Sequence, residues 1–359
     1  MKVLMISIDR GLLGQNQLGD VIQRHAEYGK HIDQLDVVVF SQDGFSKFPI
    51  SSNVTAYPTN SKSKWRYFFD AKKLGTKLFQ NNRYDLVTSQ DPFVTGMVAC
   101  RLKKKFKSKF LVHFHGDFWG NINWLKESKF NWSLWLVSRR VVSQADAIRV
   151  MSEGQKSKLG KHQVKAKIIS TPVDLAKYQI STSRISSRKM VLHVGRYDKA
   201  KDFSTLAKAF KLVRDKISNA DFVQCGAGPQ VKEYFSSLPL VAYPKISQSA
   251  LIDFYHQSLV VVLSSTSESF GKVLVEANAC GKPVVATATT GAKEIVQDGY
   301  NGYLVPIGDA EKLAEKIIEL LNDPVKAKEL GENGRKLVQE KFGDNTNKII
   351  NFWREIVNG

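Results

Sequence analysis

The residues best suited to chemistry lie in one short stretch of the chain, Ser267–Pro283. It follows Val260–Leu263, an apolar run typical of a buried strand, and we expect a helix to begin in it at Gly271 or Lys272. The first backbone N–H groups of a helix have no partner inside the helix, and the helix dipole places partial positive charge there. A diphosphate would therefore bind well at this end, where Gly271 lets the backbone approach an anion closely and Lys272 adds a positive charge.

Two carboxylates accompany this helix start. Glu268 lies in the loop before the helix and Glu276 lies inside it, too far along the chain to form an i,i+4 pair. We therefore expect them to serve different places: Glu276 to accept hydrogen bonds from ribose hydroxyls, and Glu268 to reach a sugar hydroxyl at the reacting end. Either glutamate taken alone is equally well explained as a complement to the positive end of the helix dipole.

A pair of cations follows another expected strand. Val191–Val194 ends in Gly195 and Arg196, and Lys201 stands where the next helix begins. Arg196 offers a bidentate fork and Lys201 a point charge, so together they would clamp a diphosphate. In isolation the two cations are equally well explained as ordinary solvated surface residues.

A histidine in the first half of the chain completes the candidate set. The expected strand Phe110–His115 carries His115, and then Gly116, to its carboxyl end. There His115 would hydrogen-bond a donor sugar or the charge that develops on a leaving group. The alternative is a strand-end histidine that the backbone satisfies.

Strand and helix patterns alternate along the whole chain, which predicts an α/β protein. In the first half we expect strands at Lys2–Ile8, Asp36–Phe40, Tyr84–Ser89, Phe110–His115, Ala147–Met151 and Ile168–Ser170, with helices at 19–30, 66–80, 93–106, 125–144 and 153–161. In the second half we expect strands at Val191–Val194, Phe222–Gln224, Val260–Leu263, Val284–Ala286 and Gly302–Val305, with helices at 203–216, 229–237, 248–257, 272–280 and 309–322. Near-continuous apolar strands of this kind indicate parallel sheets covered on both faces, which bind ligands at the carboxyl ends of their strands.

The length of 359 residues suits two domains. We expect a doubly wound, Rossmann-like domain at 1–178, a linker rich in Ser, Thr and Arg at 179–189, and a second Rossmann-like domain at 190–340 that faces the first across a cleft. The last segment, 341–359, carries an apolar cluster and is expected to form a helix that packs back on the first domain.

Charge and cysteine content narrow the class of protein. The net charge is +19, and residues 1–180 hold 29 Lys and Arg against 14 Asp and Glu, so the first half would attract nucleic acid, anionic membrane or phosphorylated substrates. No apolar run is long enough to span a membrane, and the start, Met1–Ile8, lacks the basic lead-in and cleavage site of a signal peptide. Three scattered cysteines without metal-ligand spacing fit free thiols in a reducing compartment, so we expect a cytoplasmic protein with no bound metal.

Taken together, these residues resemble the family 4 retaining glycosyltransferases, also described as glycosyl transferases group 1, which have the two-domain GT-B fold. The resemblance is carried by Ala145–Glu153, Gly195-Arg196, Lys201, Glu268, Phe270-Gly271, Glu276, Cys280–Thr287 and Asp298–Val305. It extends over essentially the whole chain. The chain departs from the family pattern at Gly19, where the usual pair of glycines in the first strand–helix loop is reduced to one, and at Asp202, which replaces a glycine after the clamp lysine.

The resemblance implies a role for each residue of the site. It makes the donor a nucleotide-diphosphate sugar whose diphosphate is bound by Arg196 and Lys201 and whose ribose is bound by Glu276. Glu268 and His115 are the residues it places at the transferred sugar. The other donor-binding residues that it implies are Gly19, Phe270, Gly271, Lys272 and Val273. It also implies transfer of a hexose with retention of anomeric configuration, without a metal or other cofactor, in which the leaving phosphate assists the acceptor hydroxyl.

The acceptor is expected on the first domain, where aromatic side chains are interleaved with cations around Trp65, Phe69, Trp124, Trp132 and Trp135. This pattern suits an interface with anionic lipid, and its alternative is an ordinary core surrounded by solvated lysines. We expect an enzyme of glycan or surface polysaccharide biosynthesis that acts on a saccharide or lipid-linked acceptor, peripherally on the inner face of the membrane, with no nucleic-acid partner. Two alternatives remain open: a nucleotide-sugar epimerase of the same fold, and a basic nucleic-acid-binding protein, although no RRM, KH or zinc-finger pattern appears.

Overall fold

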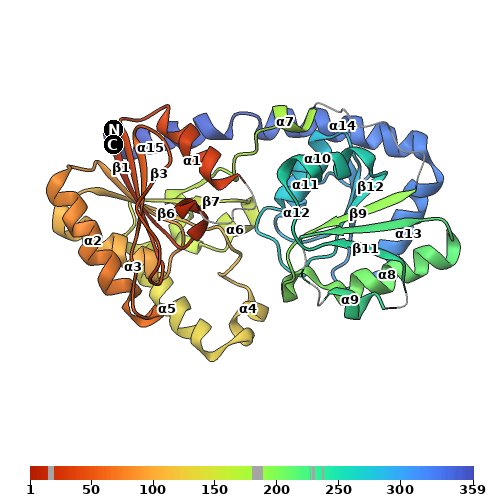
Figure 1. Ribbon diagram of the computed structural model, residues 1–359, viewed down its shortest axis with the longest axis horizontal. Coiled ribbons are helices and arrows are strands. Elements are labelled where there is room, and N and C mark those ends of the chain that lie inside the picture. Colours follow the sequence, from red (N-terminus) through yellow and green to blue (C-terminus); the bar gives the residue numbers. More distant parts are fainter. Residues whose placement is uncertain (15–19, 180–188, 227, 229–230, 237) are drawn as a thin grey trace. The chain divides into compact units, whose positions relative to one another are not determined.

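The computed structural model describes residues 1–14, 20–179, 189–226, 228, 231–236 and 238–359. The chain forms two compact units. Unit 1 comprises Met1–Ser170 together with Asn345–Gly359, and unit 2 comprises Thr171–Asp344. Each unit holds its own largely parallel sheet with helices packed against it (Figure 1).

Unit 1 is built on a sheet of eight strands among the described residues, in the order β3-β4-β2-β1-β5-β6-β7-β8. The strands are β1 Lys2–Ser7, β2 Gln34–Val39, β3 Phe48–Pro49, β4 Val54–Pro58, β5 Leu86–Ser89, β6 Lys109–His113, β7 Ala147–Val150 and β8 Ala166–Ile168. All neighbouring pairs are parallel except β3 with β4. The carboxyl ends of the parallel strands therefore lie at one edge of the sheet.

Helices cover both faces of this sheet because successive strand residues point to opposite sides. Leu4 and Ile6 pack with α2 (Tyr67–Asn81), α3 (Val94–Phe106) and α5 (Lys129–Gln144) on one face. Val3 and Met5 pack with α1 (Val21–Gly29) and α15 (Asn345–Asn358) on the other. The remaining helical segments of the unit are η1 Arg10–Leu13, η2 Lys64–Arg66, α4 Ile122–Glu127, α6 Glu153–Ser157 and η3 Gly160–Lys165.

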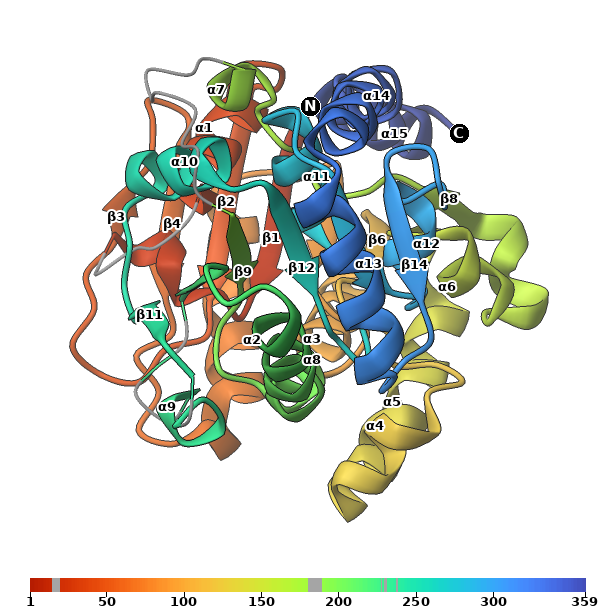
Figure 2. The same ribbon diagram turned by 90° about the vertical axis from the view of Figure 1, so that its right-hand side faces the viewer.

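Unit 2 has six described strands, all parallel, in the order β11-β10-β9-β12-β13-β14. They are β9 Met190–Val194, β10 Asp221–Cys225, β11 Leu240–Tyr243, β12 Val260–Leu263, β13 Val284–Thr287 and β14 Gly302–Val305. Its helices are α7 Ala176–Gln179, η4 Lys199–Lys201, α8 Phe203–Lys216, α9 Val231–Tyr234, α10 Gln248–Gln257, α11 Lys272–Ala279, α12 Ala292–Ile295, α13 Ala310–Asn322 and α14 Pro324–Phe342. The helices α8 and α13 lie side by side and bury Leu206, Phe210 and Ile317 against the sheet (Figure 2).

The predicted fold class is confirmed, since both units are doubly wound α/β structures. Three local predictions were wrong, the first being the strand expected at Ile168–Ser170, which lies at Ala166–Ile168 instead. The helix expected at 125–144 is two helices, because Ser128 adopts an extended backbone and its side chain caps α5 by accepting a hydrogen bond from the Phe130 N–H at 3.2 Å. The strand expected at Phe110–His115 ends at His113. The strands β3 and β4 were not predicted.

The division of the chain also differs in detail from the expected boundaries of 1–178, 190–340 and 341–359. The first unit ends at Ser170, so α7 belongs to unit 2, and the chain returns to unit 1 at Asn345. Most of the expected linker, residues 180–188, lies outside the described residues. None of the helices that the structure describes is long and apolar enough to cross a bilayer.

Candidate active site

The candidate site of unit 2 is assembled from the loops that follow neighbouring parallel strands. Gly195, the first residue after β9, extends the pairing with β10 by one hydrogen bond: its N–H donates to the Cys225 carbonyl at 2.9 Å. Gly226, after β10, has φ +94°, and a Cβ there would lie 3.3 Å from the Gly195 carbonyl oxygen. The two strand ends therefore approach closely through glycine. Arg196, next along the chain, is exposed and forms no ion pair with a described carboxylate.

Lys201 and Glu268, far apart in the sequence, form the central ion pair of the site. The Lys201 ammonium lies 2.6 Å from a Glu268 carboxylate oxygen, and both side chains are about one-fifth exposed. The loop after β12 is tied to η4 by two further bonds: the Ser264 hydroxyl donates to the Lys201 carbonyl at 2.7 Å and the Thr266 N–H donates to the Ala200 carbonyl at 2.8 Å. Adjacent parallel strands, β9 and β12, thus hold the cation and the carboxylate in register.

The loop that follows β13 contacts the segment from Glu268 to Phe270. The Gly291 N–H donates to the Glu268 carbonyl at 2.8 Å, and a Cβ on Gly291 would lie 2.4 Å from the Phe270 nitrogen. Phe270 is buried, with its ring 5.4 Å from that of Phe342. The backbone of the segment from Glu268 to Phe270 is therefore fixed from both sides.

The helix α11 begins as expected beside these loops. Gly271 is its N-cap with φ +83°, a left-handed conformation that favours glycine, and no side chain caps the helix. Lys272 and Val273 form its first turn and are partly exposed. The start of α11, which no side chain caps, lies beside Glu268 and its partner Lys201, and the helix dipole makes it an electropositive end suited to an anion.

Glu276 is buried in α11 and already has protein donors on both oxygens. The Tyr178 hydroxyl donates to Oε1 at 2.9 Å and the Tyr255 hydroxyl donates to Oε2 at 2.8 Å. The Lys272 ammonium lies 3.3 Å from Oε1. Burial, and then the Glu276 charge, raise the pKa of Tyr255, so its hydroxyl stays a donor. Oε1 therefore faces two donors, whereas Oε2 accepts from Tyr255 and keeps a further lone pair.

Tyr178 and Tyr255 were not predicted from the sequence as site residues. Tyr178 stood at the expected domain boundary, and Tyr255 stood in the helix expected at 248–257. Neither lies at a spacing that relates it to Glu276, so no local signal could have found this network.

In unit 1, His115 lies just beyond the end of β6 and is half-buried, with its ring 5.5 Å from that of His113. Arg149, on the neighbouring strand β7, is buried and donates to His113 Nδ1 at 3.2 Å and to the carbonyls of Ile169 and Ser170 at 2.7 and 2.9 Å. Burial lowers the pKa of Arg149 to about 10. Burial and the Arg149 charge hold the pKa of His113 and of His115 well below the usual range, so both imidazoles are neutral at pH 7.

Two further predictions concern Gly19 and the absence of a metal site. Gly19 lies outside the described residues. Among the residues that are described, no three His, Cys, Asp or Glu side chains gather in a way that could hold a metal ion. Arg149, like the two tyrosines, was not predicted from the sequence, because a single arginine inside an apolar strand carries no motif.

Comparison with known proteins decides the family. Residues 26–177 match the model described as Glycosyltransferase Family 4, and residues 177–337 match the model described as Glycosyl transferases group 1. An uncharacterized glycosyltransferase of Methanocaldococcus jannaschii is 30% identical over 95% of this chain and 94% of its own. The chain belongs to the family 4 glycosyltransferases. A second relative, the capsular polysaccharide biosynthesis glycosyltransferase CapM of Staphylococcus aureus, is 31% identical over 52% of each chain.

Solved structures show that this glycosyltransferase has the GT-B fold. Sucrose-phosphate synthase from Thermosynechococcus elongatus superposes with a TM-score of 0.84 over 99% of both chains at 22% identity. HepE from Anabaena, solved in complex with UDP-glucose, superposes with a TM-score of 0.78 over 99% of both chains at 19% identity. At these identities the likeness concerns the fold.

Proposed function

We propose that this glycosyltransferase moves a hexose from a nucleoside diphosphate sugar to a saccharide or lipid-linked acceptor, with retention of anomeric configuration, in the synthesis of a surface polysaccharide. The observation that carries the proposal is the meeting of Lys201, Glu268 and the uncapped start of α11 at the carboxyl ends of β9 and β12. The names of two similar proteins, one of capsular polysaccharide biosynthesis and one bound to UDP-glucose, support the substrate class.

The residues of unit 2 suit each part of such a donor. The diphosphate would bind the N–H groups of α11 with Arg196 and Lys201, and the ribose would bind Glu276. These positive groups stabilise the charge that develops on the leaving diphosphate, the part that a divalent ion plays in other enzymes, so we expect transfer without a metal. No nucleotide-bound metal or other cofactor is needed for this scheme.

The chemical step follows from the same arrangement. The bond between the anomeric carbon and the phosphate oxygen breaks as the acceptor oxygen bonds to that carbon, and the acceptor proton passes to the leaving phosphate oxygen. Attack from the face that the phosphate leaves retains the configuration. Glu268 would orient the transferred sugar, and His115, neutral at pH 7, would hydrogen-bond it.

A thermal-shift panel of UDP, GDP and ADP tests the donor site. A nucleotide at about 100 times its dissociation constant should stabilise the protein by about 2.7 kcal/mol. With the donor identified, transfer is measured with and without EDTA, and the product anomer is read by NMR. Lys201→Ala should lower turnover on the order of 100-fold, the cost of losing one group that stabilises developing charge.

The exposed neighbour Lys199 provides a matched control, since it lies in the same short helix η4 but has no described carboxylate partner. Lys199→Ala should leave turnover within about twofold of wild type. Transfer by Lys201→Ala and Glu268→Ala at the wild-type rate contradicts the assignment. Release of an isomerised nucleotide sugar without acceptor would favour the epimerase alternative.

We also propose that the enzyme binds an anionic membrane surface through the α4–α5 hairpin. Phe130, Trp132 and Leu136 are more than half exposed there, and Arg139 stacks over the Trp135 ring at 4.9 Å. Exposed aromatics beside cations are typical of interfacial segments. Flotation with phosphatidylglycerol vesicles at low salt is the test, and Trp132→Ala should reduce the bound fraction. Recovery of the wild-type protein entirely in the unbound fraction would contradict this part of the proposal.

A further inference from the structure

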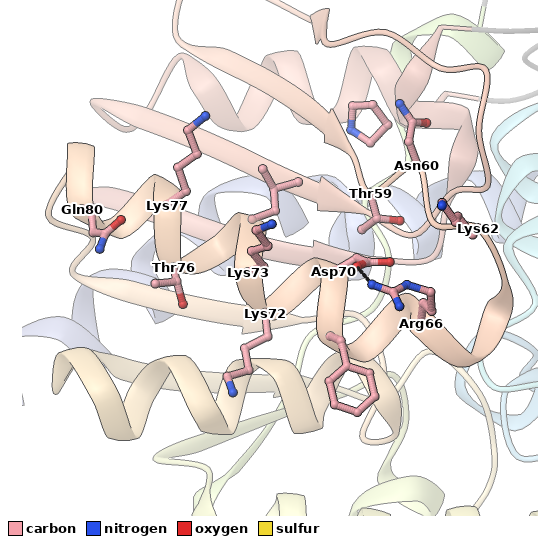
Figure 3. A pocket seen from close by; sticks show the side chains of 13 residues that line it. Thr59, Asn60, Lys62, Arg66, Asp70, Lys72, Lys73, Thr76, Lys77 and Gln80 are labelled. Atoms are coloured by element: carbon pink, nitrogen blue, oxygen red, sulfur yellow. Dashed lines mark hydrogen bonds and ion pairs between the residues drawn. The ribbon is translucent and has the colours of Figure 1, made fainter.

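A basic groove of about 850 Å³ runs beside α2 in unit 1 (Figure 3). One wall is α2 itself, and the other is formed by the residues that follow β4, Thr59 and Asn60. Five of the lining side chains are cations and one is a carboxylate. The groove therefore has a strong positive charge.

Most of this charge is not neutralised by the protein. The one carboxylate, Asp70, lies 3.4 Å from Arg66 on the same helix. Lys62, Lys73 and Lys77 are exposed and form no ion pair with any described carboxylate. Figure 3 shows Lys73 and Lys77 extending from α2 toward one side and Lys72 toward the other. The uncompensated lysines would attract an anionic ligand.

The wall formed by Thr59 and Asn60 is held in place by hydrogen bonds to neighbouring backbone groups. The Thr59 hydroxyl donates to the Ser41 carbonyl at 3.0 Å and accepts from the Ser41 N–H at 3.0 Å. The Asn60 side chain donates to the Phe45 carbonyl at 2.7 Å and accepts from the Phe45 N–H at 3.3 Å, which holds Asn60 in a left-handed conformation with φ 45°. A fixed wall that faces long cationic side chains suits a ligand bound along the groove.

The position of the groove relates it to the acceptor side of unit 1. Thr59 follows β4 at the same edge of the sheet where His115 follows β6, because β4, β2, β1, β5 and β6 are parallel. Four strand spacings separate β4 from β6, or about 19 Å. From Arg66 to Lys77 the line of cations along α2 extends roughly another 16 Å. A monosaccharide cannot span these distances, but an extended saccharide can.

We propose that this groove binds the acidic part of a long acceptor saccharide, several sugar units away from the unit that receives the new hexose. The anionic groups would be carboxylates or phosphates along the chain, which the lysines of α2 would contact as adaptable point charges. Phe69, which lines the groove and is 64% exposed, offers an apolar face to a sugar ring. This inference rests on the proposed function, since it specifies the acceptor of the same reaction.

The test measures binding of a long and a short oligogalacturonate, which carry a carboxylate on each sugar, by isothermal titration calorimetry on the full chain. The long oligomer should bind more tightly than the short one, and added salt should weaken it. Lys73→Gln combined with Lys77→Gln should weaken binding of the long oligomer by roughly 2- to 30-fold, the sum of two exposed charge contacts. Neutral maltooligosaccharides of the same lengths should show no such loss.

The matched control is Lys104→Gln with Lys105→Gln, which removes the same charge from exposed residues of α3. Equal weakening by both double variants would mean that only net charge matters and would overturn the proposal, as would no binding of the long oligomer by the wild type. Loss of phosphatidylglycerol vesicle binding by Lys73→Gln/Lys77→Gln, with saccharide binding unchanged, would also overturn it in favour of lipid. Thermal shifts with UDP, GDP and ADP on the same variants report on the donor site separately. If no nucleotide stabilises the protein, that result contradicts the proposed function and leaves the test of the groove unaffected.

Discussion

Replacing Tyr255 with phenylalanine isolates the hydrogen bond that holds Glu276. Tyr255 is fully buried, and its hydroxyl donates to the Glu276 carboxylate at 2.8 Å. The phenylalanine ring would keep the packing against Tyr178, whose ring lies 6.2 Å away, so the change leaves almost no cavity. What is lost is one hydrogen bond to a buried charge, which is worth about 1.5–3 kcal/mol.

The chain carries an internal reference for this measurement. All six tryptophans lie in unit 1, so their fluorescence follows the unfolding of that unit, whereas far-UV circular dichroism also follows unit 2. With a urea slope of about 2 kcal/mol per M, the unit 2 midpoint of Tyr255→Phe should fall by roughly 0.7–1.5 M. The fluorescence midpoint should move less.

The same variant tests whether Glu276 needs both tyrosines for ligand binding. Without Tyr255, one oxygen loses the donor that orients it, so affinity for the stabilising nucleotide should fall by about tenfold. Tyr178→Phe serves as the parallel variant, since its hydroxyl binds the other oxygen at 2.9 Å. A loss of unfolding free energy below about 0.5 kcal/mol, within the ordinary range for surface substitutions, would refute the reasoning.

Three other perturbations test separate features of the structure. Lys201→Met and Glu268→Gln, alone and combined, should show a coupling of about 1 kcal/mol in unfolding free energy, and strict additivity would argue against their ion pair. Gly331→Ala would place a Cβ 2.0 Å from the Gly281 carbonyl oxygen and should lower the urea midpoint of unit 2 by an overpacking cost of about 1–3 kcal/mol or more. Burial lowers the pKa of His193 from 6.5 to about 3, so the unfolded chain binds a proton on this residue more readily than the folded protein does. The free energy of unfolding that His193 contributes above pH 6.5 is therefore lost as the pH falls toward 3. By pH 5 this loss is about 2 kcal/mol. His193→Phe should abolish it when the free energies of unfolding from urea titrations at pH 7 and pH 5 are compared. An unchanged pH dependence in the variant would exclude His193 as its source.

The main strands and helices were predictable from the sequence because their signals are local. Runs such as Val260–Leu263 and the pattern of α8 and α13 depend on side-chain type and period within a few residues. The same holds for the start of α11, where Gly271 adopts the left-handed conformation that glycine favours. The strands β3 and β4 escaped prediction because one has two residues and the other ends in prolyl and polar residues that weaken the pattern.

The sequence by itself determined the α/β class, the family and the short stretch that begins with Glu268, since each depends on residue type and spacing along the chain. Only the tertiary structure decided which groups meet that stretch. Tyr178 reaches Glu276 across 98 positions of sequence, and Lys201 reaches Glu268 across 67. Tyr178, Lys201 and the groove beside α2 depend on how separate elements pack, and a contact between distant elements leaves no period or spacing in the sequence to reveal it.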